Sequence, residues 1–247
     1  MANRVLAGVM PVANFRFYAE LNDFLLSELR FTEFACGFLD VATVKDRIQS
    51  FGVPHTEVDL ILVNGRPVDF AYRVQDGDRI SVYPVFEAFD ISGLTRLRPH
   101  PLRDPRFVLD VHLGRLARYL RMSGFDTLYQ NRCTDERLAE VSRQEHRILL
   151  TRDVGLLKRS SVTHGYCLQA TKPRQQLVEV VGRFDLVRLT KPFSRCLRCN
   201  TLLVEAGKDQ VRRQLFAQVA LLHDEFQRCP DCGRAYWKGG HFRGMRQ

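Results

Sequence analysis

The stretch from 107 to 122 most constrains the fold, because its hydrophobic period changes partway along. Its first three residues form a short apolar run that is typical of a buried parallel strand. After Asp110, apolar residues recur at helical spacing, with Arg115 and Arg118 on the flank. Asp110 therefore stands where a strand ends and a helix begins, which is the edge of an open α/β sheet where ligands bind.

The same alternation continues to about residue 190. After a strand that follows Gly124, a third strand, again apolar, is expected at 147–153 and again ends in an aspartate, Asp153. Asp135 begins a helix after the candidate N-cap Thr134. Strands that alternate with helices predict a parallel sheet with crossover helices. Because parallel strands end at one edge, Asp110 and Asp153 converge there if their strands are neighbours, and Asp135 needs the tertiary fold to bring it near.

These three aspartates are the candidate catalytic residues. Carboxylates crowded together repel one another unless a cation compensates, and Mg²⁺ or Mn²⁺ with oxygen ligands does so. Such an ion can polarise a phosphodiester and activate water for in-line attack. Each aspartate alone is also explained as a cap, a turn or a salt-bridge residue, and capping is a serious competitor for Asp135 at its helix start.

The charge of the chain is distributed unevenly. Residues 1–95 contain 8 Lys and Arg against 13 Asp and Glu, whereas residues 96–247 contain 29 against 15. The basic region at 96–247 favours a polyanionic partner, because a protein that neutralises phosphates releases their counterions. The alternative is an arginine-rich surface that is only solvated. The acidic first part is not expected to touch nucleic acid directly; it covers the basic part or recruits another protein.

At 247 residues the chain is long enough for two modest domains or one large one, and its apolar fraction of 45% is enough for proper cores. No uncharged apolar run reaches the roughly 18 residues that a membrane span needs, so no membrane association is expected. The first ten residues lack the long apolar centre of a signal peptide, which makes a cytoplasmic protein the expectation.

Cysteine spacing gives the sharpest metal signal. Two C-x-x-C pairs stand near the end of the chain: Cys196 with Cys199, and Cys229 with Cys232. Two intervening residues let both thiolates of a pair bind one tetrahedral Zn²⁺, and Asn200 and Gly233 tolerate the left-handed turn after each pair. We expect a structural zinc ribbon at 191–247. Cys36, Cys133 and Cys167 are interpreted as ordinary buried thiols.

The first part, 12–90, has the order strand, strand, helix, strands of a ubiquitin-like β-grasp. The expected strands are 13–19, 31–38, 58–63, 68–72 and 79–85. Thr43 with Asp46 predicts a helix N-cap, Gly52 a helix end, and Asn64-Gly65 a hairpin turn. The segments Leu62-Val63-Asn64-Gly65 and 77–82 (GDRISV) resemble small sulfur-carrier proteins of this fold. Those carriers end in Gly-Gly, but here the last strand continues into residues 86–94 (FEAFDISGL) without a Gly-Gly tail. A recognition or docking module is therefore the better interpretation.

Residues 91–105 combine arginines with prolines and show no periodicity, which predicts a linker. We therefore expect a β-grasp domain at 12–90, a linker at 91–105, an α/β domain at 106–190 and the zinc ribbon at 191–247.

Three segments carry a family resemblance: residues 108–121 (VLDVHLGRLARYLR), Gly124-Phe125-Asp126 and residues 148–157 (ILLTRDVGLL). They resemble the PIN-like ribonuclease family named for the mut-seven C-terminal domain, over about Arg106 to the C-terminus. The resemblance implies a PIN-like α/β fold in which acidic residues at strand ends bind Mg²⁺ or Mn²⁺ and cut RNA. Asp110 and Asp153 match best and Asp135 well. The chain departs from the pattern at Val154 and Gly155, where such domains usually offer a further carboxylate.

Cations and aromatics supply the candidate RNA contacts. The expected residues are Arg115, Arg118, Arg121, Arg152, Lys158, Arg159, Trp237 and Lys238. The arginines of the first helix lie roughly along one side, near the predicted metal, and the last two residues belong to a stretch that interleaves rings with cations, which suits stacking and phosphate contact. The alternatives are a solvated helix face and rings that merely pack on the ribbon.

Taken together, the sequence predicts a Mg²⁺- or Mn²⁺-dependent ribonuclease or RNA-processing factor with RNA as its partner. A second partner, a protein, is expected to bind the acidic ubiquitin-like domain. The alternative is a non-catalytic RNA- or ribosome-binding adaptor on the same fold. Sulfur-carrier biochemistry is opposed by the absent Gly-Gly tail.

Overall fold

A computed structural model of the 247-residue chain describes residues 10–38, 42–84, 97 and 105–238. The chain divides into two compact units. The first comprises Met1–Arg103 together with Asp153–Cys167, and the second comprises Asp104–Arg152 together with Leu168–Gln247. The expected linker at 91–105 lies outside the described residues, apart from Leu97 and Pro105.

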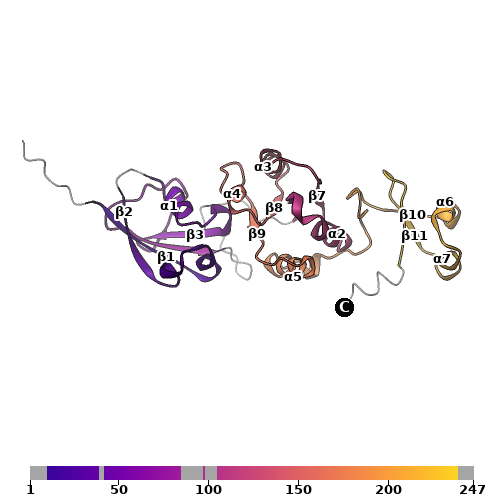
Figure 1. Cartoon of the computed structure of the whole chain (residues 1–247), viewed down its shortest axis with the longest axis horizontal. Coiled ribbons are helices and arrows are strands. Elements are labelled where there is room, and N and C mark those ends of the chain that lie inside the picture. Colours follow the sequence, from indigo (N-terminus) through magenta and orange to yellow (C-terminus); the bar gives the residue numbers. More distant parts are fainter. Residues whose placement is uncertain (1–9, 39–41, 85–96, 98–104, 239–247) are drawn as a thin grey trace, which may run out of the picture. The chain divides into compact units, whose positions relative to one another are not determined.

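The first unit contains a five-stranded sheet in the order β2-β1-β5-β3-β4. Its strands are β1 (Val12–Phe17), β2 (Glu33–Gly37), β3 (Val58–Val63), β4 (Arg66–Pro67) and β5 (Arg79–Pro84). β1 and β5 are parallel, and the other pairs are antiparallel. Figure 1 shows helix α1 (Val44–Ser50) beside this sheet, and Ile48 of α1 is buried in one core with Phe15, Ile61 and Ile80. This is the ubiquitin-like β-grasp that the sequence predicts.

Local signals in the β-grasp act as expected, with one correction. Thr43 and Asp46 form a capping box at the start of α1, and Asn64 and Gly65 take the left-handed conformations of a tight hairpin turn (φ +51° and +78°). The expected return strand at 68–72 was wrong, because β4 stops at Pro67. After Val68 the chain turns, with the Asp69 carboxylate accepting the Ala71 main-chain N–H at 2.9 Å.

Three 3₁₀ turns join these elements: η1 (Ala19–Phe24), η2 (Ser27–Leu29) and η3 (His55–Glu57). The first unit also contains α4 (Val154–Leu157) and β9 (Gly165–Cys167), which come from much later in the sequence.

The second unit begins with the α/β part. Its parallel strands are β6 (Phe107–Leu109), β7 (Thr127–Tyr129) and β8 (Ile148–Thr151), in the order β7-β6-β8. β6 is parallel to both β7 and β8, as the alternating sequence pattern predicts. The helices are α2 (Gly114–Met122), α3 (Asp135–Gln144) and α5 (Pro173–Arg183), with short 3₁₀ turns η4 (Val111–Leu113) and η5 (Val187–Leu189). α3 covers one face of the sheet, and α2 packs with α5 on the other (Figure 1).

The end of the second unit is a small antiparallel sheet in the order β10-β11-β12. Its elements are β10 (Val204–Ala206), α6 (Lys208–Val211), η6 (Arg212–Gln214), α7 (Ala217–Leu222), β11 (Phe226–Arg228) and β12 (Ala235–Trp237). Two of the four cysteines of the C-x-x-C pairs, Cys196 and Cys229, are buried. Within the described ranges, no helix is both long and apolar enough to cross a bilayer.

Candidate functional site

Asp110 directly follows β6, the central strand of the three parallel strands, and is the N-cap of η4. Its Oδ2 accepts a hydrogen bond from Thr151 Oγ1 at 2.7 Å, and its Oδ1 accepts the Val111 N–H at 2.6 Å. Thr151 is the last residue of the neighbouring strand β8, so two adjacent strand ends hold one carboxylate. With 9% of its surface exposed, Asp110 is largely removed from water yet still reachable. Each oxygen also keeps a lone pair, which a cation could use.

Asp135 begins α3, where Thr134 is the N-cap and accepts the Arg137 N–H. The capping role therefore belongs to Thr134. Asp110 and Asp135 both act on the thiol of Cys133. Burial raises the pKa of Cys133, the Arg137 guanidinium lowers it, and the two carboxylates raise it further. The structure thus places two of the three predicted aspartates near Cys133, where both carboxylates disfavour the ionised form of its thiol.

Asp153 is the N-cap of the short helix α4. Its Oδ1 accepts the main-chain N–H of Gly155 at 2.7 Å and of Leu156 at 3.4 Å, and the residue is exposed. Asp110 and Asp135 belong to the second unit, whereas Asp153 belongs to the first. Their joint role in binding a cation stays a prediction.

The four cysteines do form such a group. The Sγ atoms of Cys196, Cys199, Cys229 and Cys232 all lie within 4.8 Å of one another. In a tetrahedral site with metal–sulfur bonds of about 2.3 Å, neighbouring sulfurs are about 3.8 Å apart. The Cys196 and Cys232 sulfurs are 3.7 Å apart, so the cluster fits one four-thiolate metal ion. The turns after each pair are left-handed as expected, with φ +71° at both Asn200 and Gly233.

Protonation within this cluster is uneven when no cation is present. Burial opposes ionisation of Cys196, but hydrogen bonds from the Tyr236 hydroxyl and from main-chain N–H groups lower the pKa of its thiol to about 6. By contrast, a hydrogen bond with Cys232 and burial raise the pKa of Cys199 to about 12. Crowded sulfurs cannot all carry charge, and a divalent cation removes that conflict.

The first cysteine pair is fixed to the α/β part by buried polar groups. Arg121 of α2, 5% exposed, donates from Nη1 to the carbonyls of Leu197 and Arg198 at 3.1 and 2.9 Å. Its Nε donates to Thr127 O at 2.9 Å. The sequence interpretation of Arg121 as an RNA contact is therefore not kept, because its guanidinium is buried and used by main-chain acceptors.

Asn200 completes this attachment. Its side chain accepts the Thr127 N–H and donates to Asp126 Oδ1, which also accepts from Arg147 at 2.6 Å. Burial opposes ionisation of Asp126, yet the hydrogen bonds from Arg147 and Asn200 bring the pKa of that carboxyl below its usual value.

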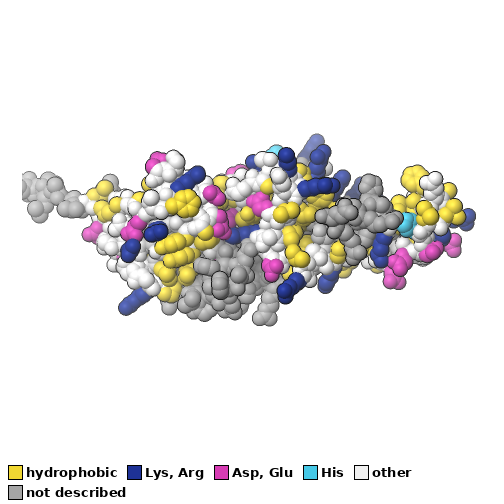
Figure 2. All heavy atoms as spheres, turned by 90° about the horizontal axis from the view of Figure 1, so that it is seen from below, with side chains coloured by type: hydrophobic (Ala, Val, Ile, Leu, Met, Phe, Trp, Pro, Cys, Tyr) yellow, Lys and Arg dark blue, Asp and Glu magenta, His cyan; other side chains and the backbone are white. Residues whose placement is uncertain are grey.

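Arg115 and Arg118 are exposed on α2 and line one pocket of about 430 Å³. The pocket also contains His112 and the start of α5, around Thr171 and Pro173. Two guanidinium groups and an imidazole around an open hollow suit phosphate groups. Figure 2 shows Lys and Arg side chains gathered on one face of the middle part of the chain.

The remaining predicted RNA contacts have varied surroundings. Arg152 is exposed and Arg159 half-buried, while Lys158 Nζ donates to the carbonyl of Gln49 at 2.9 Å. Trp237 is half-buried in β12, and Lys238 is exposed, with an ion pair to Glu225 at 2.8 Å.

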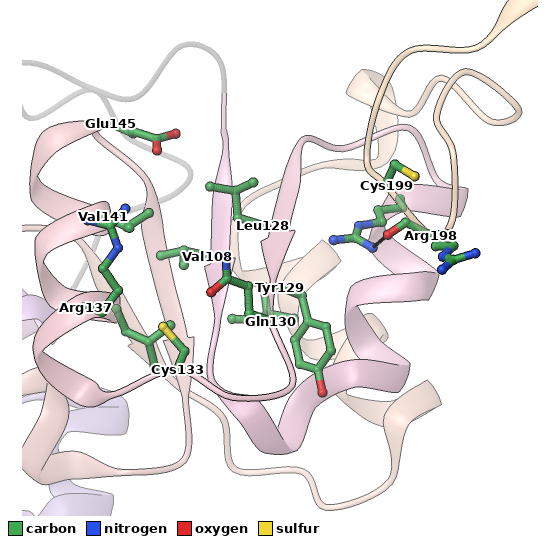
Figure 3. A pocket seen from close by; sticks show the side chains of 13 residues that line it. Val108, Leu128, Tyr129, Gln130, Cys133, Arg137, Val141, Glu145, Arg198 and Cys199 are labelled. Atoms are coloured by element: carbon green, nitrogen blue, oxygen red, sulfur yellow. Dashed lines mark hydrogen bonds between the residues drawn. The ribbon is translucent and has the colours of Figure 1, made fainter. Parts of the chain in front are cut away.

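A second pocket, of about 300 Å³, was missed by sequence reasoning. Figure 3 shows it over β6 and β7, between α3 and the first cysteine pair. Val108, Leu128 and Val141 give it an apolar lining, and its charged lining residues include Arg137 and Glu145. Because the lining residues come from separate segments, no local sequence pattern could have grouped them.

Comparisons with known proteins agree with this architecture. A family model of the Mut7-C RNAse domain matches residues 105–247, and a Mut7-C ubiquitin model matches residues 10–90. The "Exonuclease mut-7 homolog" of Homo sapiens is 42% identical over 107 residues, which are 40% of this chain but 12% of the human protein.

Two solved structures resemble about a third of the chain. They are small archaeal modifier protein 1 of H. volcanii (15% identity, 31% of this chain, 99% of that one) and a putative molybdopterin converting factor subunit 1 of Pyrococcus furiosus (21%, 31% and 99%). Both give a TM-score of 0.25. Since the RNAse-domain model matches more than half of the residues, this chain belongs to the Mut7-C RNAse domain family.

Proposed function

We propose that this chain is a divalent-metal-dependent ribonuclease with a PIN-like catalytic domain. The observation that carries the proposal is Asp110, a largely buried carboxylate at the end of the central parallel strand. It is oriented by Thr151 from the next strand. Membership of the Mut7-C RNAse family and a relative named as an exonuclease support the same reaction class.

In this proposal Asp110, Asp135 and Asp153 hold Mg²⁺ or Mn²⁺. A bound ion would polarise the phosphodiester and lower the pKa of an attacking water. Thr151 keeps the Asp110 carboxylate in one rotamer. Arg115 and Arg118, which line one pocket, bind backbone phosphates next to the scissile bond.

We further propose that the four cysteines hold a structural Zn²⁺. Four thiolates fill a tetrahedral coordination sphere and leave no position for water, so this ion takes no part in hydrolysis. Its role is to hold the first cysteine pair in the conformation that packs on α2, where the Arg121 guanidinium donates to the carbonyls of Leu197 and Arg198. We also propose that the protein works in a reducing compartment such as the cytoplasm, where cysteine pairs of this spacing bind metal and do not form disulfides.

RNA cleavage by single variants tests the proposal. Purified zinc-loaded protein is incubated with mixed RNA and Mg²⁺ or Mn²⁺, and the variants are Asp110→Asn and Asp153→Asn. We expect both to lose cleavage while RNA binding is kept. Glu140→Gln is the matched control, because Glu140 pairs with Arg143 on the surface of α3 and should leave cleavage unchanged. Equal cleavage by all four proteins would refute the assignment.

A second candidate function is a non-catalytic RNA- or ribosome-binding adaptor. It is favoured by one observation: both Asp110 oxygens already accept hydrogen bonds, from Val111 N–H and from Thr151 Oγ1. RNA binding without metal-dependent cleavage by the wild type would select this alternative.

A further inference from the structure

The ubiquitin-like part and a piece of the RNAse domain share one compact unit. The RNAse-domain model spans 105–247, yet residues 153–167 belong with the β-grasp. This piece, here called the strap, begins at Asp153 and contains α4 and β9. Leu156, Leu157 and Val162 of the strap are buried.

The first polar link joins the strap to the end of α1. Gln49 Nε2 donates to the carbonyl of Lys158 at 2.8 Å, and Lys158 Nζ donates in return to the carbonyl of Gln49 at 2.9 Å. Each residue thus satisfies a main-chain acceptor of the other. Such a reciprocal pair fixes the register of the two segments.

The second and third links come from the 3₁₀ turn η3. His55, 5% exposed, contacts the carbonyl of Val162 through Nε2 at 2.7 Å and Gln49 Nε2 through Nδ1 at 3.2 Å. Since a carbonyl only accepts, His55 carries its proton on Nε2. Glu57 is 1% exposed, and its Oε1 accepts the main-chain N–H of Cys167 at 2.6 Å. A buried carboxylate that accepts from the strap backbone is costly to leave unpaired.

From these contacts we infer that the ubiquitin-like domain is a positioning element of the RNAse domain, with Gln49, His55 and Glu57 as the residues that hold the strap. The fold places the first strap residue, Asp153, at the start of a segment whose backbone is gripped at Lys158, Val162 and Cys167. The catalytic consequence rests on the proposed function of Asp153. The β-grasp thus acts within its own chain, whatever other partner it binds.

Hydrogen exchange of the full-length, zinc-loaded chain tests directly whether the β-grasp residues hold the strap. In Glu57→Ala we expect amides of the strap, and the Cys167 amide above all, to exchange about tenfold faster or more, because a buried charged hydrogen bond is removed. Glu57→Gln keeps an oxygen that can accept the Cys167 N–H and should restore protection. Glu33→Ala, which removes an exposed partner of Arg79 in the same sheet, is the control and should leave the strap unchanged. Gln49→Ala, a half-buried position, is the milder variant if Glu57→Ala does not fold.

Steady-state kinetics of RNA cleavage distinguish a role of Glu57 in positioning Asp153 from a role in the stability of the strap alone. With RNA and Mn²⁺, Glu57→Ala should lower kcat with little change in KM, and Glu57→Gln should recover kcat. Unchanged strap exchange in both Glu57→Ala and Gln49→Ala would overturn the inference. Faster exchange with an unchanged kcat would overturn its catalytic part. A wild type that does not cleave RNA contradicts the proposed function, and the exchange experiment still decides whether η3 holds the strap.

Discussion

Arg121 gives the most quantitative prediction, because its environment is fully specified. Replacing it with alanine removes three hydrogen bonds to main-chain carbonyls, of Thr127, Leu197 and Arg198. The Thr127 acceptor is buried and would lose its partner at a cost of about 1–3 kcal/mol. The other two bonds are only partly buried, so water can replace the donor there and each removal costs about 0.5–1 kcal/mol.

The expected total is therefore about 3 kcal/mol, reduced somewhat because the wild type bears the cost of burying a guanidinium. That is a large part of the roughly 5–15 kcal/mol that stabilises a typical domain. Urea unfolding can be followed by the fluorescence of Trp237, which is the single tryptophan of the chain and lies in β12. With a slope of about 1–3 kcal/mol per molar urea, the midpoint should fall by about 1 M or more.

Arg118→Ala is the matched control for this measurement. It removes an arginine from the same helix, but one that is exposed, so its effect should stay within about 0.5 kcal/mol. If Arg121→Ala shifts the midpoint no more than Arg118→Ala does, then Arg121 does not fasten the first cysteine pair and the structural role given to it is wrong.

Three further predictions concern the Asp126 carboxylate, the cysteine cluster and the exposed arginines of α2. The fold lowers the pKa of Asp126, so the stability that this carboxylate contributes is present above about pH 4 and is lost as pH falls through its folded pKa. The urea midpoint of Asp126→Asn should therefore depend less on pH between about 2 and 6 than that of the wild type does. Cys229→Ser should abolish the bound zinc found by metal analysis of the wild type, whereas a zinc content equal to that of the wild type would contradict a four-thiolate site. Arg115→Gln combined with Arg118→Gln should weaken RNA binding and lower the salt dependence of log K by about 1 for each phosphate that is no longer neutralised, measured by titration at several salt concentrations; an unchanged slope would exclude phosphate binding by both arginines.

Signals that act within a few residues predicted the local structure well. The Thr43 cap, the Asn64-Gly65 turn and the left-handed residues after each cysteine pair are all present. The change from a strand period to a helix period at Asp110 also placed β6 and the helix after it. These features depend on backbone sterics and side-chain hydrogen bonds inside one segment, so the sequence contains all the information they need.

Contacts between distant segments could not be predicted in the same way. Arg115, Arg118 and Arg121 share a three-residue spacing, but each step of three turns about 60° backward around a helix. Arg121 is therefore about 120° from Arg115 and reaches the buried side, where it meets the carbonyls of the ribbon. Likewise, nothing local in Gln49 or Lys158 indicates that they exchange hydrogen bonds across 109 positions.

Electron paramagnetic resonance of bound Mn²⁺ tests the central claim most directly, because it detects the proposed ion without needing an RNA substrate. Zinc-loaded wild type should bind Mn²⁺, Asp110→Asn should bind it at least about tenfold more weakly, and Glu140→Gln should behave as the wild type. Equal Mn²⁺ binding by the wild type and Asp110→Asn, or no binding by either, would contradict a catalytic cation held at the end of β6.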